Sequence, residues 1–156
     1  INWSLTNLLF FIGIAGWVIG GLGAVIDATI SNNVVLHNTM WVPAHFHTYN
    51  AMGNVLFSIA FFYWFSTQTT SLPKLEKHTK WVLAILLVGG IGFLLAFYLA
   101  GADSIPRRYS TYPSELASGS TLAIIGAAFA SIYLVAILAF FYHISKRCLN
   151  ILFLRS

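Results

Sequence analysis

Four long apolar segments constrain the fold of this chain more than any other feature of its sequence. They cover roughly residues 5–26, 40–65, 81–100 and 122–144. An α-helix needs about 20 apolar residues to cross the hydrocarbon core of a bilayer, and each segment is long enough. Loop-forming residues separate the segments. We therefore expect an all-α, polytopic transmembrane helix bundle with four spans, occupying the whole of residues 1–156.

The composition supports a membrane protein and argues against a nucleic-acid partner. Of the 156 residues, 58% are hydrophobic and only 8% are charged, whereas a soluble domain carries about 25% charged residues. The formal net charge is +4, but the basic residues stand in short clusters between the apolar runs, as expected for loops beside a bilayer. We predict contact with membrane lipid and no contact with nucleic acid.

The basic residues also predict an orientation. Six of the eight fall on one side of a four-span arrangement: Lys74, Lys77, Lys80, Lys146, Arg147 and Arg155. The positive-inside rule makes that side cytoplasmic, or the matrix in a mitochondrion, and places both chain ends there. The two remaining basic residues, Arg107 and Arg108, are adjacent and fall on the outer side, so they call for a different explanation.

Neither the start of the chain nor its single cysteine supplies a function. The sequence opens on Ile1 and enters an apolar segment at once, without the features of a signal peptide, so we expect a piece of a longer polypeptide. Cys148 has no second cysteine with which to form a disulfide or a redox motif.

The first apolar segment is rich in glycine. Gly16 and Gly20 have the spacing that allows two membrane helices to approach closely. The same lack of side chains would also leave room for a bulky, flat ligand beside the helix.

Two histidines stand at the start of the second apolar segment, in the stretch "PAHFHTYN". Each residue of an α-helix advances by ~100°, so His45 and His47 diverge by about 200° and cannot bind one metal ion together. Each could instead serve a separate centre, and neutral imidazole is a good axial ligand of haem iron. The alternative is that both are polar residues hydrogen-bonded to neighbouring helices or water.

A polar stripe continues below the histidines. His47, Asn50, Asn54 and Ser58 recur at helical spacing, so we expect the stripe to face the protein interior. It would serve either hydrogen bonding between helices or a route for protons or water.

The outer arginine pair fits the same haem hypothesis. Haem propionates are carboxylates, which arginine binds with charge-assisted hydrogen bonds. Arg107 and Arg108 fall on the outer side, near the histidine pair, and His37 with Asn38 could join the same polar layer. Anchoring in lipid head groups is the other interpretation.

Two segments together resemble one family closely. The stretches "VLHNTMWVPAHFHTYNAMGN" and "AGADSIPRRYSTYP" are similar to the C-terminal part of subunit I of the haem–copper terminal respiratory oxidases. The resemblance covers essentially the whole chain and implies that the four spans correspond to the last four of about a dozen core helices.

The resemblance implies a role for each candidate residue. His45 would bind the iron of the high-spin haem, where oxygen is reduced opposite a copper ion, and His47 would bind the iron of the low-spin haem, which passes electrons on. Arg107 and Arg108 would hydrogen-bond the propionates, and His37 would lie in the same layer. Copper would be held by residues outside this chain.

The sequence departs from the mitochondrial pattern at two places. Asn38 replaces an aspartate that helps to hold magnesium, which argues against that magnesium site here. With Trp41 it is more similar to the B-type branch of bacteria and archaea, so a bacterial or archaeal plasma membrane is favoured over the mitochondrial inner membrane. Thr111 and Ser114 stand where other members often have acids, which weakens a proton-exit role.

The resemblance implies part of an enzyme that reduces O2 to water and moves protons across the membrane. The family's copper-binding histidines, its cross-linked tyrosine and its second low-spin haem ligand would have to precede these helices, since His78 and His143 fall at the inner side. Expected partners are the remainder of subunit I, subunit II and other subunits, with cytochrome c, a small copper protein or quinol as electron donor. The alternatives are a nitric oxide reductase, a dihaem electron carrier without enzymatic activity, and a purely structural membrane subunit.

Overall fold

The computed structural model describes residues 4–68 and 76–154. Within them every named element is a helix, which confirms the all-α fold. Lys74 and Arg155, two of the basic residues used to predict the orientation, lie outside the described residues, as do the side chains of Lys77 and Arg147.

Three continuous helices match three of the predicted spans. They are α1 (Leu5–Ala28), α5 (Glu76–Ala102) and α6 (Ala117–Leu154). Each contains a stretch that is long and apolar enough to cross a membrane. The helices extend beyond the apolar segments, because a helix can continue through polar residues once its apolar part is formed.

The segment predicted as the second span is helical from residue 41 to residue 68 but is not one regular α-helix. It consists of α3 (Trp41–His47), the π-helix η1 (Thr48–Asn54) and α4 (Val55–Gln68). Pro43 is tolerated because it stands in the first turn, where its missing N–H costs no helical hydrogen bond. The fourth span thus remains a prediction, although helix covers the predicted segment almost completely.

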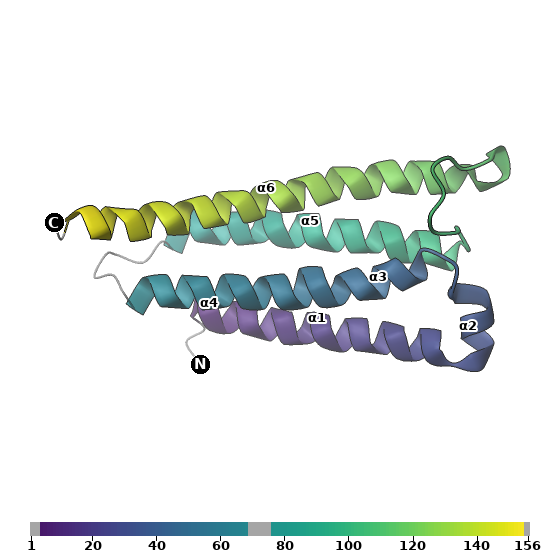
Figure 1. Ribbon diagram of the computed structural model, residues 1–156, viewed down its shortest axis with the longest axis horizontal. Coiled ribbons are helices and arrows are strands. Elements are labelled where there is room, and N and C mark those ends of the chain that lie inside the picture. The colour runs from purple at the N-terminus through teal and green to yellow at the C-terminus, as the bar shows by residue number, and fades with distance from the viewer. Residues whose placement is uncertain (1–3, 69–75, 155–156) are drawn as a thin grey trace.

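The long helices lie side by side along the long axis of the molecule (Figure 1). α1 packs against α3, η1 and α4, while α5 packs against α6 and also contacts α3. The first turn of α1 and the last turns of α6 lie at the same end, which agrees with an even number of passes. The described fold is therefore two helical pairs joined along the 41–68 column.

The glycines of α1 form the contact with the 41–68 column. Gly16 is buried, and a Cβ atom there would lie 2.6 Å from the Cβ atom of Met52. A Cβ atom at Gly20 would lie 3.2 Å from both the His45 carbonyl oxygen and the Tyr49 amide nitrogen. Close helix packing, one of the two interpretations of these glycines, is thus what the described residues show.

The connections at the other end contain two short helices that the apolar pattern did not predict. α2 (Ile30–Leu36) follows α1 directly, and the 3₁₀ turn η2 (Ser114–Leu116) precedes α6. α2 lies within a segment expected to be a loop. Its seven residues are too few for a helical apolar pattern to be recognised, and the Asn33 side chain supports it by donating a hydrogen bond to the Asp27 carbonyl oxygen (2.9 Å).

Two of these connections are joined by backbone hydrogen bonds. Thr39 and Pro106 form an isolated antiparallel bridge. The Met40 amide donates to the Ile105 carbonyl oxygen (2.9 Å), and the Arg107 amide donates to the Asn38 carbonyl oxygen (3.0 Å). Two segments that are almost seventy residues apart in the sequence, 38–40 and 105–107, are therefore hydrogen-bonded to each other just before α3 begins.

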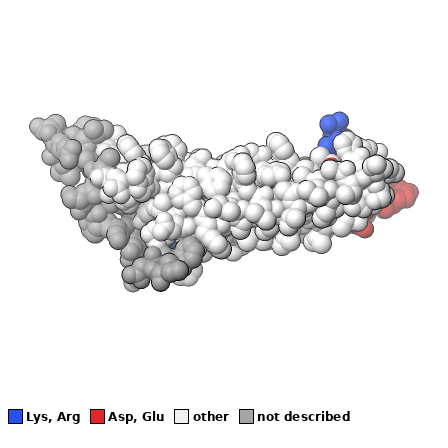
Figure 2. Space-filling view, turned by 90° about the horizontal axis from the view of Figure 1, so that it is seen from below, with Lys and Arg blue, Asp and Glu red and all other residues white. Residues whose placement is uncertain are grey.

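Arginine and acidic side chains lie at this end of the molecule, whereas the long middle section of the face in Figure 2 shows no charged side chain. An uncharged belt between polar ends is the distribution that a bilayer requires. The chain is thus organised as a membrane protein with a polar layer around the bridge.

Candidate functional site

Helix α3 directs its two histidines toward different neighbours. The His45 ring lies toward Asp27, at the end of α1, with Nε2 at 3.8 Å from Asp27 Oδ2. The His47 ring packs against Phe93 and Phe97 of α5, with ring centroids 5.5 Å and 5.7 Å away. The divergence predicted from helical geometry is therefore present in the described contacts.

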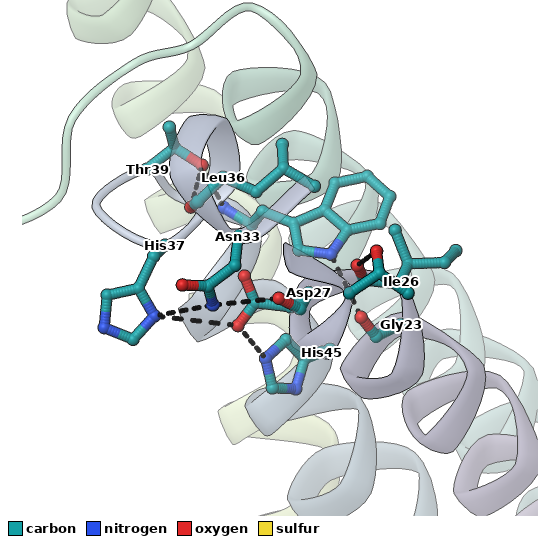
Figure 3. Close-up of polar contacts among 10 residues, drawn as sticks. Gly23, Ile26, Asp27, Asn33, Leu36, His37, Thr39 and His45 are labelled. Atoms are coloured by element: carbon teal, nitrogen blue, oxygen red, sulfur yellow. Dashed lines mark hydrogen bonds and ion pairs between the residues drawn. The ribbon is translucent and has the colours of Figure 1, made fainter. Parts of the chain in front are cut away.

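Asp27 lies between two of the candidate histidines (Figure 3). Its Oδ2 atom is 3.8 Å from His45 Nε2 and 4.0 Å from His37 Nδ1. The side chain of His37 is 61% exposed, whereas those of His45 and Asp27 are 14% and 13% exposed. The structure thus joins His37 and His45 through an acid that the sequence patterns had not singled out.

Several polar atoms in this region are buried without a hydrogen-bond partner among the described residues. Both ring nitrogens of His45 are in this state, as are Asp27 Oδ1 and Arg107 Nε. Leaving a buried polar group unpaired costs about 1–3 kcal/mol, so such atoms indicate a missing ligand or partner. An imidazole nitrogen suits haem iron and a guanidinium nitrogen suits a carboxylate. The residues present therefore fit a haem group.

A hollow of about 670 Å³ opens between α5, the start of α6 and the loop that joins them. Its lining includes Phe93 and Phe97, the two rings that contact His47, together with Arg108 and Tyr112. Pockets for cofactors commonly measure ~300–1,000 Å³ and combine apolar walls with a few polar groups. Arg108 and the neighbourhood of His47 therefore border one cavity.

The arginine pair is placed by its loop. The backbone of Arg107 is fixed by the hydrogen bond from its amide to the Asn38 carbonyl oxygen. The Tyr112 hydroxyl also supports this loop, since it donates a hydrogen bond to the Pro106 carbonyl oxygen (3.1 Å). Arg108 has φ 71°, a left-handed conformation that is uncommon for a residue with a side chain. Such backbone conformations tend to occur where a side chain has a functional position to hold.

The polar stripe is not a single interior-facing row within the described chain. Asn54 and Ser58 are exposed, and Asn54 Oδ1 accepts a hydrogen bond from Trp17 Nε1 of α1 (3.3 Å), whereas His47 packs on α5. The π-helix between them explains the difference, because its wider turn rotates the later residues relative to an α-helix. The described helices thus leave Asn54 and Ser58 uncovered, and the expectation that the stripe faces the protein interior stays a prediction for the longer subunit.

Polar atoms of the stripe nevertheless form a ladder along the helix. Asn50 Nδ2 donates to the Phe46 carbonyl oxygen (3.0 Å), and Asn54 Nδ2 donates to Asn50 Oδ1 (3.1 Å). The Ser58 hydroxyl donates to the Asn54 carbonyl oxygen (2.8 Å). These three bonds lie within one helical column, and only the bond from Trp17 to Asn54 supports hydrogen bonding between helices, one of the two interpretations of the stripe.

The described residues contain no group of three or more His, Cys, Asp or Glu side chains that could hold a metal ion. The prediction that copper is held by residues outside this chain stays a prediction.

Comparison with known proteins identifies the family. Residues 1–133 match the family described as cytochrome c and quinol oxidase polypeptide I. The chain belongs to the cytochrome c and quinol oxidase polypeptide I family. The resemblance seen in the two sequence segments is thereby confirmed, and His37, His45, His47, Arg107 and Arg108 all lie within the matched residues.

Two curated relatives illustrate how far the similarity reaches. Cytochrome c oxidase polypeptide 1 of Halobacterium salinarum is 38% identical over 124 residues, covering 77% of this chain and 20% of that protein. Cytochrome c oxidase subunit 1 of Thermus thermophilus is 27% identical over 136 residues, covering 84% of this chain and 24% of that protein. The chain thus spans about a quarter or less of the length of these family members.

A solved structure shows the same fold. A haem–copper terminal oxidase dimer determined by cryo-EM superposes with a TM-score of 0.63, covering 86% of this chain and 26% of that chain, at 23% sequence identity. The helical arrangement is therefore that of the oxidase family.

Proposed function

We propose that this chain forms part of the catalytic subunit of a terminal respiratory oxidase, which reduces O2 to water at a haem–copper centre and couples the reaction to proton translocation. Membership of the oxidase family supports the reaction class. The main observation that supports the proposal for this chain is that the rings of His45 and His47 lie on different sides of α3. The His45 ring lies toward Asp27, and the His47 ring packs against Phe93 and Phe97.

In this proposal α3 serves as a wall between two haem groups. His45 would hold the iron of one haem on its side of α3, and His47 would hold the iron of the other on the side of α5. Haem iron, when bound, supplies one-electron transfer and oxygen binding. The packing of the His47 ring against Phe93 and Phe97 holds that imidazole in one orientation, which would suit it to bind iron.

The polar layer around the loop bridge would bind the haem propionates. Arg107 Nε is buried without a hydrogen-bond partner in the described part of the chain, and Arg108 lines the hollow beside the rings that contact His47. Arginine can offer two parallel hydrogen bonds to a carboxylate, which fixes its position as well as its charge. His37, exposed at the same end, would contribute to this layer.

Copper, the remainder of subunit I, subunit II and the electron donor belong to the same proposal. Copper would be held by histidines of the upstream part of the subunit, and cytochrome c, a small copper protein or quinol would deliver electrons. The archaeal and bacterial relatives support a prokaryotic plasma membrane, and Asn38 with Trp41 supports the B-type branch without a magnesium site at this position.

Replacing one histidine at a time in the intact oxidase tests the proposal. His47→Met should alter the low-spin haem spectrum and leave the high-spin haem bound. His45→Met should remove the high-spin haem signal and abolish oxygen consumption. Optical and electron paramagnetic resonance spectra of the purified complex, with an oxygen electrode, provide the measurements.

His143→Met is the matched control, because His143 is an exposed histidine of α6 far along the chain from α3. It should preserve both spectra. Unchanged haem spectra in both α3 variants would refute the two-haem assignment, and turnover of nitric oxide instead of O2 by the wild-type complex would favour the reductase relatives.

A further inference from the structure

Thr48 is a buried polar residue to which the proposed function gives no role. It directly follows α3, and only 3% of its surface is exposed. At about 100° per residue, its side chain projects about 60° from His45 and about 100° from His47, within the narrower arc between the two imidazoles. A contact at Thr48 therefore acts on the helix between both candidate ligands.

The hydroxyl of Thr48 belongs to a short chain of hydrogen bonds. Thr48 Oγ1 donates to the Ala44 carbonyl oxygen (2.8 Å), and the hydroxyl oxygen of Tyr98 on α5 lies 3.1 Å from Thr48 Oγ1. A threonine hydroxyl has one hydrogen to donate. Because that hydrogen is used on Ala44, the Tyr98 hydroxyl donates to Thr48 and links α5 to the residue that follows His47.

Tyr98 is itself held where three helices meet. Its ring packs edge-on against Trp41 of α3, with ring centroids 5.1 Å apart and 78° between the ring planes. Trp41 Nε1 donates a hydrogen bond to the Gly23 carbonyl oxygen of α1 (3.2 Å). A Cβ atom at Gly23 would lie 3.1 Å from the Tyr98 hydroxyl oxygen and 2.8 Å from the Cβ atom of His45. Gly23, the Tyr98 hydroxyl and the start of the His45 side chain therefore meet at one point of the bundle.

Helix α5 also contacts the other histidine. Phe97, the neighbour of Tyr98 in the sequence, packs against the His47 ring, as does Phe93 one turn earlier. Helix α5 thus touches this part of the chain both at the His47 imidazole and at Thr48. A rotation of α3 about its axis would break the hydrogen bond between Tyr98 and Thr48 at a buried site, where water cannot replace the lost partner.

We infer that Tyr98 is a positioning residue for both histidines proposed to bind haem iron, because its hydrogen bond to Thr48 fixes the rotation of α3 about its axis. That rotation sets the directions of the His45 and His47 imidazoles. The inference rests on the proposed roles of His45 and His47. Tyr98 acts through the helix that carries the two ligands and needs no contact with haem.

Tyr98→Phe in the assembled oxidase tests the inference, because it removes only the hydroxyl and keeps the ring that packs against Trp41. Both haems should be retained. The g values of the ferric low-spin haem, measured by electron paramagnetic resonance, depend on the orientation of the imidazole plane and should shift. The iron–histidine stretching band of the ferrous high-spin haem, measured by resonance Raman spectroscopy, should also shift. If either signal stayed at its wild-type position, the inference of a common effect on both histidines would be wrong.

Variants of Thr48 test the same bond from its other end. Thr48→Val has nearly the same shape but can neither donate nor accept, so both signals should shift as in Tyr98→Phe. Thr48→Ser keeps the hydroxyl and should keep both signals at their wild-type positions. A shift of equal size in Thr48→Ser would mean that the methyl group matters and not the hydrogen bond, which would refute the inference. This comparison remains decisive if Tyr98→Phe fails to assemble.

The double variant Tyr98→Phe/Thr48→Val shows whether the two residues act through one bond. Residues that share an interaction have non-additive effects. Adding Tyr98→Phe to Thr48→Val should therefore cause no further shift in either signal. A further shift as large as that of Tyr98→Phe alone would show independent effects and contradict the inference.

Tyr142→Phe is the matched control, because it removes a tyrosine hydroxyl at an exposed position of α6. Both signals should stay in place, and an equal shift in this variant would overturn the assignment to Tyr98. The spectra of His45→Met and His47→Met separate the two levels of the argument. Loss of one haem signal in each of them, with wild-type signals in the Tyr98 and Thr48 variants, would remove only the role of Tyr98. Retained signals in both histidine variants would instead remove the proposed function of α3.

Discussion

At the scale of single residues, the direction of a side chain could be predicted where helical geometry alone decides it. His45 and His47 diverge because they are two residues apart on the same α-helix, and the contacts to Asp27 and to Phe93 confirm this. The same spacing argument carries no information about what a side chain meets across the bundle. That requires the packing of other helices.

The glycines of α1 give a prediction at this scale. Gly16→Ala should lower stability by about 1–3 kcal/mol, because a Cβ atom would lie 2.8 Å from the backbone carbon and oxygen of Met52. The temperature of half-inactivation of the purified oxidase measures the loss.

Gly21→Ala is the matched control in the same helix. A Cβ atom at Gly21 would meet only the Tyr49 hydroxyl, at 3.5 Å, an ordinary contact. Alanine also favours a helix more than glycine does, so stability should be unchanged or slightly higher. Equal losses at Gly16 and Gly21 would contradict the packing described for α1.

Asp27 shows what a single sequence leaves hidden at the residue scale. It follows the first apolar segment, where an acid is ordinary in a loop, and no spacing links it to His37 or His45. The contact arises because α2 turns the chain back and the start of α3 packs beside the end of α1. A lone acid at the end of an apolar run was the only available signal.

At the scale of elements, the apolar segments predicted where helices occur but not their internal regularity. The run from Thr48 to Asn54 is a π-helix, although its sequence has no proline and only Gly53 as an unusual residue. Tertiary contacts support it. The Tyr133 hydroxyl of α6 donates a hydrogen bond to the Ala51 carbonyl oxygen, and Trp17 packs over Gly53.

Tyr133→Phe should therefore weaken the attachment of α6 to η1. Tyr133 is buried, and its loss leaves the Ala51 carbonyl oxygen without that partner, which costs about 1 kcal/mol. Hydrogen exchange measured by mass spectrometry should show faster exchange in peptides covering residues 48–54. Tyr142→Phe, at an exposed position of the same helix, should leave exchange unchanged, and slower or equal exchange in both variants would argue against the role of this bond.

At the scale of the whole molecule, the described helices have apolar faces that they do not cover for one another. Val18, Leu22 and Val25 of α1 are 57%, 60% and 63% exposed and fall on one side of that helix. Such a face must meet lipid or other protein in a bilayer. The oxidase relatives are four to five times longer than the region they share with this chain, so both kinds of neighbour are available in an assembled subunit.

The predicted orientation gives a test at this scale. With Cys148 replaced by serine, Thr111→Cys in the loop before α6 should react with a membrane-impermeant maleimide in intact cells, since Thr111 is exposed and its loop is predicted to face outward. Lys80→Cys, exposed at the opposite end of α5, should react only after the membrane is made permeable. The reverse pattern would invert the orientation predicted from the basic residues.

The backbone bridge between Thr39 and Pro106 has a consequence for how this region can vary in evolution. Only residues 103–105 separate the end of α5 from the bridge, and Arg107 follows it immediately. An insertion or deletion there would slide the arginines past the start of α3, whereas the stretch from Tyr109 to Ser114 lies beyond the bridge. We expect related chains to tolerate changes of loop length in the second stretch and to reject them in the first, which an alignment of homologous sequences can decide.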